Sequence, residues 1–218
     1  MKLKRILLSG MKVVAIALCG ASIAKPVLAD TITGNITFLK KASYAGVVYM
    51  LPAEPVGSLG ITGKIDQKDK AFTKKIVVTA ADGALQFNNS DAIDHNIFAN
   101  DLNTNVKFDV GLMTPNSERK IDTTWESDSL VRIGCKIHPK MKAYVFNSPS
   151  PYYQVIEFKK GVNSYDFTIN DVPKDVTKLA LKIPKYQELI IDIAEGSQTV
   201  DVLRKGKKKA DMTVTRSP

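Results

Sequence analysis

One short segment of this chain gathers three side chains that suit a soft metal ion. Cys135, His138 and Met141 follow one another at intervals of three residues, and the other histidine of the chain, His95, lies forty residues before Cys135. A thiolate and two imidazoles in a trigonal arrangement, with a thioether as a weak axial contact, form the donor set of a mononuclear blue-copper site. Structural zinc usually takes a fourth strong donor. The residue types and their spacing therefore predict one copper ion held by His95, Cys135, His138 and Met141.

Each of these residues also has an ordinary structural role when it occurs alone. A single cysteine is commonly a small buried hydrophobe, and a single histidine is commonly a hydrogen-bonded group of the surface or the core. The whole chain has two cysteines and two histidines. Because three of the four candidate ligands fall within seven residues at the end of a predicted strand, the pattern favours metal binding over independent structural roles.

The segments that must hold these ligands have the alternation of β-strands. Within residues 130–135 the apolar positions share one face with Cys135, which predicts a buried thiolate. Residues 84–88 alternate in the same way, and the polar segment that follows begins the loop toward His95. We therefore expect a turn after Cys135 to deliver two more ligands to a point that a distant strand reaches with His95.

Patterns of period two recur along almost the entire chain. The predicted strands before residue 149 are 32–39, 46–50, 61–66, 75–79, 84–88, 96–99, 119–125, 130–135 and 142–146, and those after it are 153–158, 165–169, 179–183, 188–193, 199–203 and 210–215. No segment of helical length is amphipathic. The predicted fold class is therefore all-β, with one β-sandwich packed against a second, smaller one.

The first 29 residues have the composition of an export signal. Basic residues precede the apolar run 13–18, and a small-residue cleavage motif ends at Ala29. We expect cleavage there, a periplasmic or secreted protein, and no transmembrane segment in the mature chain, because the apolar stretch is too short to span a bilayer. The alternative is a lipoprotein acylated at Cys19, but Leu18 is bulkier than that motif favours.

The charge of the chain is concentrated at its two ends. The formal net charge is +9, but the predicted signal holds five basic residues and no acid, and residues 204–218 hold six bases and one acid. The nearly neutral body between them gives nucleic-acid binding no electrostatic support. The basic segment 204–209 suits an anionic membrane surface or an acidic partner, but the alternating apolar residues beside it favour the solvated turn of a terminal hairpin.

Four motifs occur in order between residues 61 and 148. They are Asn89-Ser90-Asp91, His95-Asn96-Ile97-Phe98, Phe108-Asp109-Val110-Gly111-Leu112 and Cys135-Lys136-Ile137-His138-Pro139-Lys140-Met141. With these motifs the segment resembles the cupredoxins, and more closely the plastocyanin-like and amicyanin-like exported proteins labelled methylamine-utilisation-like. The Cys-x2-His-x2-Met spacing is similar to that of amicyanin.

The resemblance implies a Greek-key β-sandwich with a type 1 copper site. His95, Cys135 and His138 would be its equatorial ligands and Met141 its axial ligand, while Asn96 would supply an amide that ties the two ligand segments together. His138 would lie at the protein surface as the electron port. Its surroundings would be Pro139, Leu112 and Met113.

The segments on either side resemble a different fold. Residues 32–51 and 153–193, with Phe167-Thr168-Ile169-Asn170-Asp171-Val172-Pro173, resemble a transthyretin-like or carboxypeptidase-regulatory-like β-sandwich, although Lys174-Asp175 stand where that pattern often has glycine. This resemblance implies that the copper domain, 61–148, is inserted into a second sandwich. Residues 149–218 would form that sandwich, with a basic hairpin turn, and 30–60 would supply N-terminal strands that either join it or stand apart.

Together these features predict an exported, non-catalytic carrier of single electrons, with copper as its cofactor. An envelope redox protein, for example a cytochrome or a dehydrogenase, would dock near His138. A type 2 catalytic copper needs additional histidines and a dinuclear centre needs a second cysteine, so the composition of the mature chain excludes both. The alternatives are a protein that stores or delivers copper and a structural envelope module whose metal clips a loop to the sheet.

Overall fold

The computed structural model describes residues 29–42, 44–54, 56–193 and 196–218. Within these ranges the chain forms seventeen strands and no helix, which confirms the predicted all-β class. The predicted signal lies outside the described residues, apart from Ala29. In the part of the chain that the structure describes, no helix is long and apolar enough to cross a membrane.

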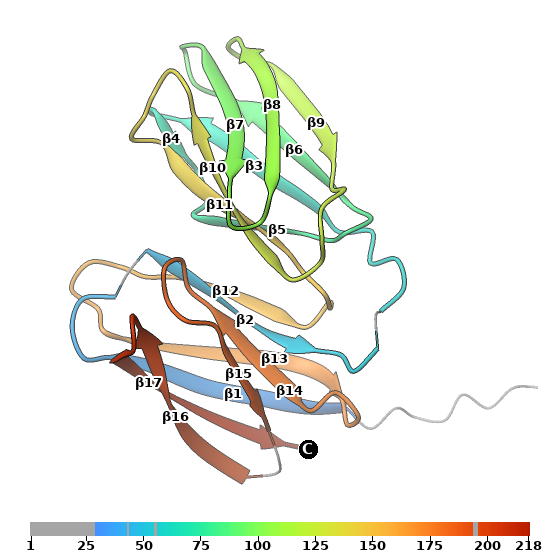
Figure 1. The fold of residues 1–218 in the computed structure, drawn as a ribbon, viewed down its shortest axis with the longest axis vertical. Helices are drawn as coiled ribbons and strands as arrows, with labels where there is room; N and C mark the ends of the chain where they lie inside the picture. Colours follow the sequence, from blue (N-terminus) through green and yellow to red (C-terminus); the bar gives the residue numbers. More distant parts are fainter. Residues whose placement is uncertain (1–28, 43, 55, 194–195) are drawn as a thin grey trace, which may run out of the picture.

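Two sheets formed by β3 to β11 make the first sandwich, which is the upper one in Figure 1. Its sheets have the strand orders β4-β3-β6-β9 and β5-β11-β10-β7-β8, with parallel pairing of β3 with β6 and of β5 with β11. The strands are β3 (Thr62–Lys68), β4 (Ala71–Phe72), β5 (Ile76–Thr79), β6 (Ala84–Asn89), β7 (His95–Asp101), β8 (Val106–Met113), β9 (Glu118–Asp122), β10 (Ser129–Cys135) and β11 (Lys142–Asn147). Leu85 and Phe87 of one sheet and Val131 and Ile133 of the other fill the core between them.

The remaining strands make the second sandwich, which is the lower one in Figure 1. Its sheets have the orders β13-β1-β17-β16 and β12-β2-β14-β15. The strands are β1 (Ala29–Phe38), β2 (Ala45–Leu51), β12 (Tyr153–Glu157), β13 (Ser164–Pro173), β14 (Lys178–Lys182), β15 (Leu189–Asp192), β16 (Gly196–Arg204) and β17 (Lys207–Ser217). Strands β1 and β2 thus pair with strands that lie more than one hundred residues later in the sequence.

Strand β2 is buried on both of its faces, because it belongs to one sandwich and contacts the other. Val48 and Met50 enter the core of the second sandwich. On the opposite face, Val47 and Tyr49 pack with strands β5 and β11 of the first sandwich, and the Tyr49 ring lies 4.7 Å from that of Phe146. The two sandwiches therefore share an apolar interface.

A polar network closes the edge of this interface. The Tyr49 hydroxyl donates to Asp128, which directly precedes β10, and the Lys182 ammonium lies 2.9 Å from carboxylate oxygens of both Asp128 and Glu188. Burial and the bond to Asp128 raise the pKa of Tyr49. One end of β10 is thus anchored to the second sandwich, and its other end carries Cys135.

The main omission from the predicted strands is β8. This strand lies at the edge of its sheet, and its pairing with β7 shifts register between Asn96 and Phe98. Gly111 adopts a positive φ of 76° within it. An irregular edge strand that is exposed on one side gives a weak alternation pattern, and this explains why the pattern did not predict it.

The strand predicted at 119–125 ends earlier than its alternation suggested. β9 ends at Asp122, and Trp125 lies in the loop beyond it. The Trp125 ring stacks on Phe108 with a centroid separation of 5.9 Å. Trp125 therefore packs against the core of the first sandwich from a loop.

Candidate metal centre

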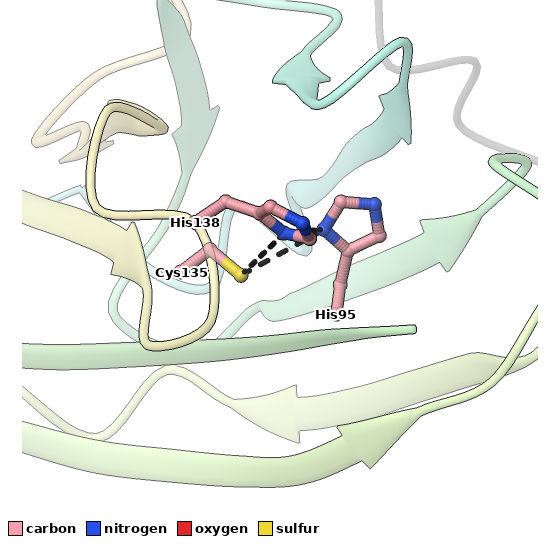
Figure 2. Close-up of side chains that lie close together, drawn as sticks. All are labelled: His95, Cys135 and His138. Atoms are coloured by element: carbon pink, nitrogen blue, oxygen red, sulfur yellow. Dashed lines mark hydrogen bonds between the residues drawn. The ribbon is translucent and has the colours of Figure 1, made fainter. Parts of the chain in front are cut away.

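The candidate ligands come from two neighbouring strands and the turn that follows one of them. His95 is the first residue of β7 and Cys135 is the last residue of β10. These strands pair antiparallel, with Cys135 opposite Ile97, so their ligand-bearing ends meet at the same edge. His138 lies in the turn after Cys135, and Figure 2 shows its ring facing both other side chains.

The three donor atoms form a small triangle. The Cys135 Sγ lies 3.7 Å from the His95 Nδ1 and 3.6 Å from the His138 Nδ1, and the two Nδ1 atoms are 3.2 Å apart (Figure 2). Bonds of about 2.0–2.1 Å to nitrogen and about 2.3 Å to sulfur would separate the donors of a trigonal ion by roughly 3.5–3.8 Å. The triangle thus has close to the dimensions that one first-row metal ion requires.

The protonation of His95 also fits a metal ligand. Its side chain is fully buried, and its Nε2 lies 3.1 Å from the Asp91 Oδ2. Because a carboxylate accepts hydrogen bonds, the proton of this ring belongs on Nε2, which leaves the lone pair of Nδ1 facing the Cys135 sulfur. A carboxylate behind a ligating imidazole is a common means of fixing its tautomer and orientation.

Backbone donors hold Asp91 in its charged form. The amide of Lys70 donates to Asp91 Oδ2 at 2.8 Å and the amide of Ala92 donates to Oδ1 at 2.9 Å. The bond from Lys70, followed by the bond from His95, lowers the pKa of Asp91. Sequence reasoning did not assign this role to Asp91; the four-residue step from Asp91 to His95 is the signal that could have indicated it.

The loop that carries Asp91 is fixed by Asn89. The Asn89 amide nitrogen donates to the carbonyls of Ile93 and Met113, both at 2.9 Å, and its Oδ1 accepts from the Asp91 amide at 3.0 Å. Asn89 is buried, so these bonds compete little with water. The position of the His95 ring therefore depends on a buried amide as well as on strand pairing.

Asn96 does link the two ligand segments, but it does so through its backbone and not through its side-chain amide. The backbone N–H of Asn96 points to the Cys135 sulfur at 3.4 Å, and the Asn96 carbonyl accepts from the Lys136 amide at 3.0 Å. The side-chain amide donates instead to Asp109 at 3.0 Å. The reason is the alternation of β7: His95 and Ile97 point inward, so the Asn96 side chain points to the other face.

Met141 lies at the end of the turn, directly before β11. It is buried, and its backbone N–H donates to the His138 carbonyl at 2.9 Å. This bond closes the turn that carries His138. The turn thus joins the imidazole and the thioether, while the role of Met141 as a ligand stays a prediction.

His138 is the most exposed of the three clustered donors. Desolvation by burial, which is the largest cause, lowers the pKa of His138 below its ordinary value, and the positive charge of Lys70 acts in the same direction. The neutral imidazole, which is the form that binds metals, is therefore favoured. Leu112 and Ile137 are about half exposed, whereas Met113 is fully buried and cannot belong to the predicted exposed surroundings of His138.

No protein-family model matches this chain, and no curated protein matches it. Among solved structures, the chain is similar to amicyanin from Paracoccus versutus, with 16% identity over 52% of this chain and 97% of amicyanin and a TM-score of 0.35. A purple cupredoxin from Nitrosopumilus maritimus has 14% identity over 46% of this chain and 97% of its own, with a TM-score of 0.32.

A copper-containing nitrite reductase from Thermus scotoductus SA-01 is also similar, with 18% identity over 43% of this chain and a TM-score of 0.35. This chain spans only 25% of the length of that reductase. What the cluster of His95, Cys135 and His138 can bind therefore follows from its own donor atoms.

Proposed function

We propose that this protein is a type 1 copper protein that carries single electrons. The observation that supports this is the triangle of two Nδ1 atoms and one Sγ atom, with sides of 3.2 to 3.7 Å, in which His95 and Cys135 are buried. Three strong donors of this kind, with Met141 as the weak axial contact, are the ligands of a blue-copper site. A copper ion held there supplies a one-electron couple between Cu(II) and Cu(I).

The surrounding protein would keep the ligands in place during electron transfer. His95 and Cys135 are fixed by the pairing of β7 with β10, and Asp91 holds the His95 ring from behind. The Asn96 N–H stabilises negative charge on the Cys135 sulfur, and hydrogen bonds of this kind tune reduction potential. A rigid donor set limits the rearrangement that accompanies a change of metal charge.

Burial favours electron transfer over copper delivery. Delivery requires the metal to pass to another ligand set, but His95 is 0% and Cys135 only 2% exposed. An electron needs no such opening, because it can leave through the edge of the partly exposed His138. Copper storage or delivery, and a purely structural metal, are therefore the alternatives that the experiment below must exclude.

We further propose that an envelope redox protein, such as a cytochrome or a dehydrogenase, docks at His138. Leu112, Ile137 and Pro139 are the exposed apolar residues that would contact it. The chain would reach the envelope through the predicted export signal, with cleavage after Ala29. Residues 61–148 would form the copper domain, inserted between β2 and the strands that complete the second sandwich.

The decisive experiment is a copper titration of the mature chain that starts at Asp30, followed by visible and EPR spectroscopy. An intense band in the red region and a narrow hyperfine splitting are expected, and both should disappear on reduction and return on oxidation. Colourless or irreversible binding would contradict an electron carrier. Cys135→Ser should abolish the band, and an unchanged spectrum in that variant would refute the ligand assignment.

The axial ligand needs a separate comparison. Met141→Gln should retain copper and lower the reduction potential, because an amide oxygen favours the oxidised ion more than a thioether does. Met113→Leu is the matched control, since Met113 is also buried and lies opposite His95 in the sheet. If Met113→Leu shifted the potential and Met141→Gln did not, Met141 would not be the axial ligand.

A further inference from the structure

Three loops meet at one end of the second sandwich, at the left of Figure 1. They are residues 39–42 after β1, residues 158–163 between β12 and β13, and the turn at 205–206 between β16 and β17. The Leu39 amide donates to the Lys209 carbonyl at 2.9 Å, and the Phe38 amide donates to the Asn163 carbonyl at 2.7 Å. Tertiary structure thus joins segments that are far apart in the sequence.

Each of these loops contributes exposed lysines and no acid. We call this surface the lysine face, and it consists of Lys40, Lys41, Lys159, Lys160, Lys205 and Lys207. The nearby acids are partly neutralised, since Glu157 lies 3.9 Å from the Lys75 ammonium, and Asp201 and Asp211 share Lys208. These three acids and two lysines leave a net charge of −1 beside the six lysines. The lysine face therefore carries a concentrated positive charge.

Two apolar side chains project from the same loops. Leu39 is 59% exposed and Val162 is 41% exposed. The opposite end of the second sandwich has mixed charge, since the exposed residues there include Asp171, Asp175 and Asp192 beside Lys174 and Lys178. Apolar side chains among lysines thus distinguish this end of the second sandwich from its opposite end.

We propose that the lysine face docks the protein on a bilayer that contains anionic phospholipid. Lysines near a membrane surface are attracted by anionic headgroups, and apolar side chains at loop tips gain by entering the interfacial region. A soluble polyanion would use the lysines but would leave Leu39 and Val162 in water. The sequence of 204–209 alone favours a solvated turn, and it is the two additional loops that change this conclusion.

The docked orientation would leave the candidate metal centre free. The turn that carries His138 lies at the end of the first sandwich that points away from the second, whereas the lysine face lies on the second sandwich (Figure 1). The inference does not rest on the proposed copper chemistry, because none of its residues belongs to that site.

The test is sedimentation of the mature chain that starts at Asp30 with vesicles of phosphatidylcholine, with and without one quarter phosphatidylglycerol. Binding is expected only with the anionic lipid, and it should weaken as salt is raised. The lysine variant carries Lys→Gln at 40, 41, 205 and 207. At about fivefold per lysine, its affinity should fall on the order of 600-fold.

A matched control carries Lys→Gln at 64, 68, 107 and 120, four exposed positions of the first sandwich. This variant removes the same charge, and its affinity for the vesicles should fall less than about threefold. The four positions lie beyond the screening length of the docked surface. The double variant Leu39→Ser with Val162→Ser keeps every charge, and its affinity for the vesicles should fall several-fold. Circular dichroism and copper binding should be unchanged in all three, which separates this test from that of the proposed function.

Three results would overturn the inference. The first is no sedimentation with anionic vesicles at low salt, and the second is an equal loss in the control variant. The third is full binding by the Leu39 and Val162 variant together with efficient competition by heparin, which would indicate a soluble polyanion in place of a bilayer.

Discussion

Replacement of Asp91 by asparagine is expected to weaken copper binding about tenfold without unfolding the protein. Asp91 Oδ2 is 3.1 Å from the His95 Nε2 and also accepts from the Lys70 amide, while Oδ1 accepts from the Ala92 amide. An asparagine oxygen in the place of Oδ2 would keep the first two bonds as neutral bonds. It would lose the charge and the third bond.

The size of the effect follows from these contacts. Hydrogen bonds to an ionised acceptor are roughly twice as strong as neutral ones. Asp91→Asn should therefore remove about half of the strength of the hydrogen bond from His95 to residue 91. Asp91→Ala removes all of it, and residues behind a metal ligand typically affect metal affinity by about 10–100-fold. The copper affinity should therefore fall about 100-fold in the alanine variant and about tenfold in the asparagine variant.

The assay is a competition for copper between each variant and a chelator of known affinity. Asp94→Asn is the matched control, because Asp94 is exposed, lies next to His95 in the sequence and carries the same charge. Its affinity should change less than about threefold, in line with a screened surface charge. Wild-type affinity in both Asp91 variants, or an equal loss in Asp94→Asn, would refute a specific role of the carboxylate behind His95.

Three further predictions concern the second sandwich and the interface. Asp30→Ala should lower the free energy of unfolding in urea by about 3–5 kcal/mol, because it leaves the Arg216 guanidinium buried without the carboxylate that lies 2.7 Å from its Nε. A loss below about 1 kcal/mol would contradict a buried ion pair. The double variant Asp30→Asn with Arg216→Met should recover most of the lost stability. Gly34→Ala should cost about 3 kcal/mol by the same measurement, since the added Cβ would lie 2.5 Å from the Thr213 carbonyl oxygen; a Tm equal to wild type would show that the sheet relaxes. Burial, with Tyr144 and Glu157 nearby, raises the pKa of Tyr44 to about 12. Because the folded protein holds this proton more tightly than the unfolded chain does, its contribution to the free energy of unfolding is complete below about pH 10 and is lost as the pH rises toward 12. Tyr44→Phe should flatten that fall in stability. An unchanged pH profile of stability in this variant would contradict the role of Tyr44.

Several features were predictable because they depend on local patterns. The period-two alternation of residues 130–135 predicted that Cys135 is buried with the apolar residues of its strand, and Cys135 is 2% exposed. The spacing from Cys135 to His138 predicted a turn that presents both side chains together, and their donor atoms are 3.6 Å apart. Donor chemistry and strand alternation are properties of the chain itself, so they needed no tertiary information.

Other features depended on which segments meet. The role of Asp91 follows from the direction of a loop that Asn89 holds, and the sulfur contact at Asn96 comes from its backbone. The irregular edge strand β8 also lacked a clear pattern, because only one of its faces is covered by the sheet core.

By itself, the sequence determined the all-β class and the three donor residues with their soft-metal chemistry. Only the tertiary structure decided that His95 reaches Cys135, that Asp91 stands behind His95, and that three lysine-bearing loops form one surface. The physical reason is the range of the interactions. Alternation and turn spacing act over a few residues. Strand pairing and core packing bring together residues that are far apart in the sequence, and their separation does not predict that they will be in contact.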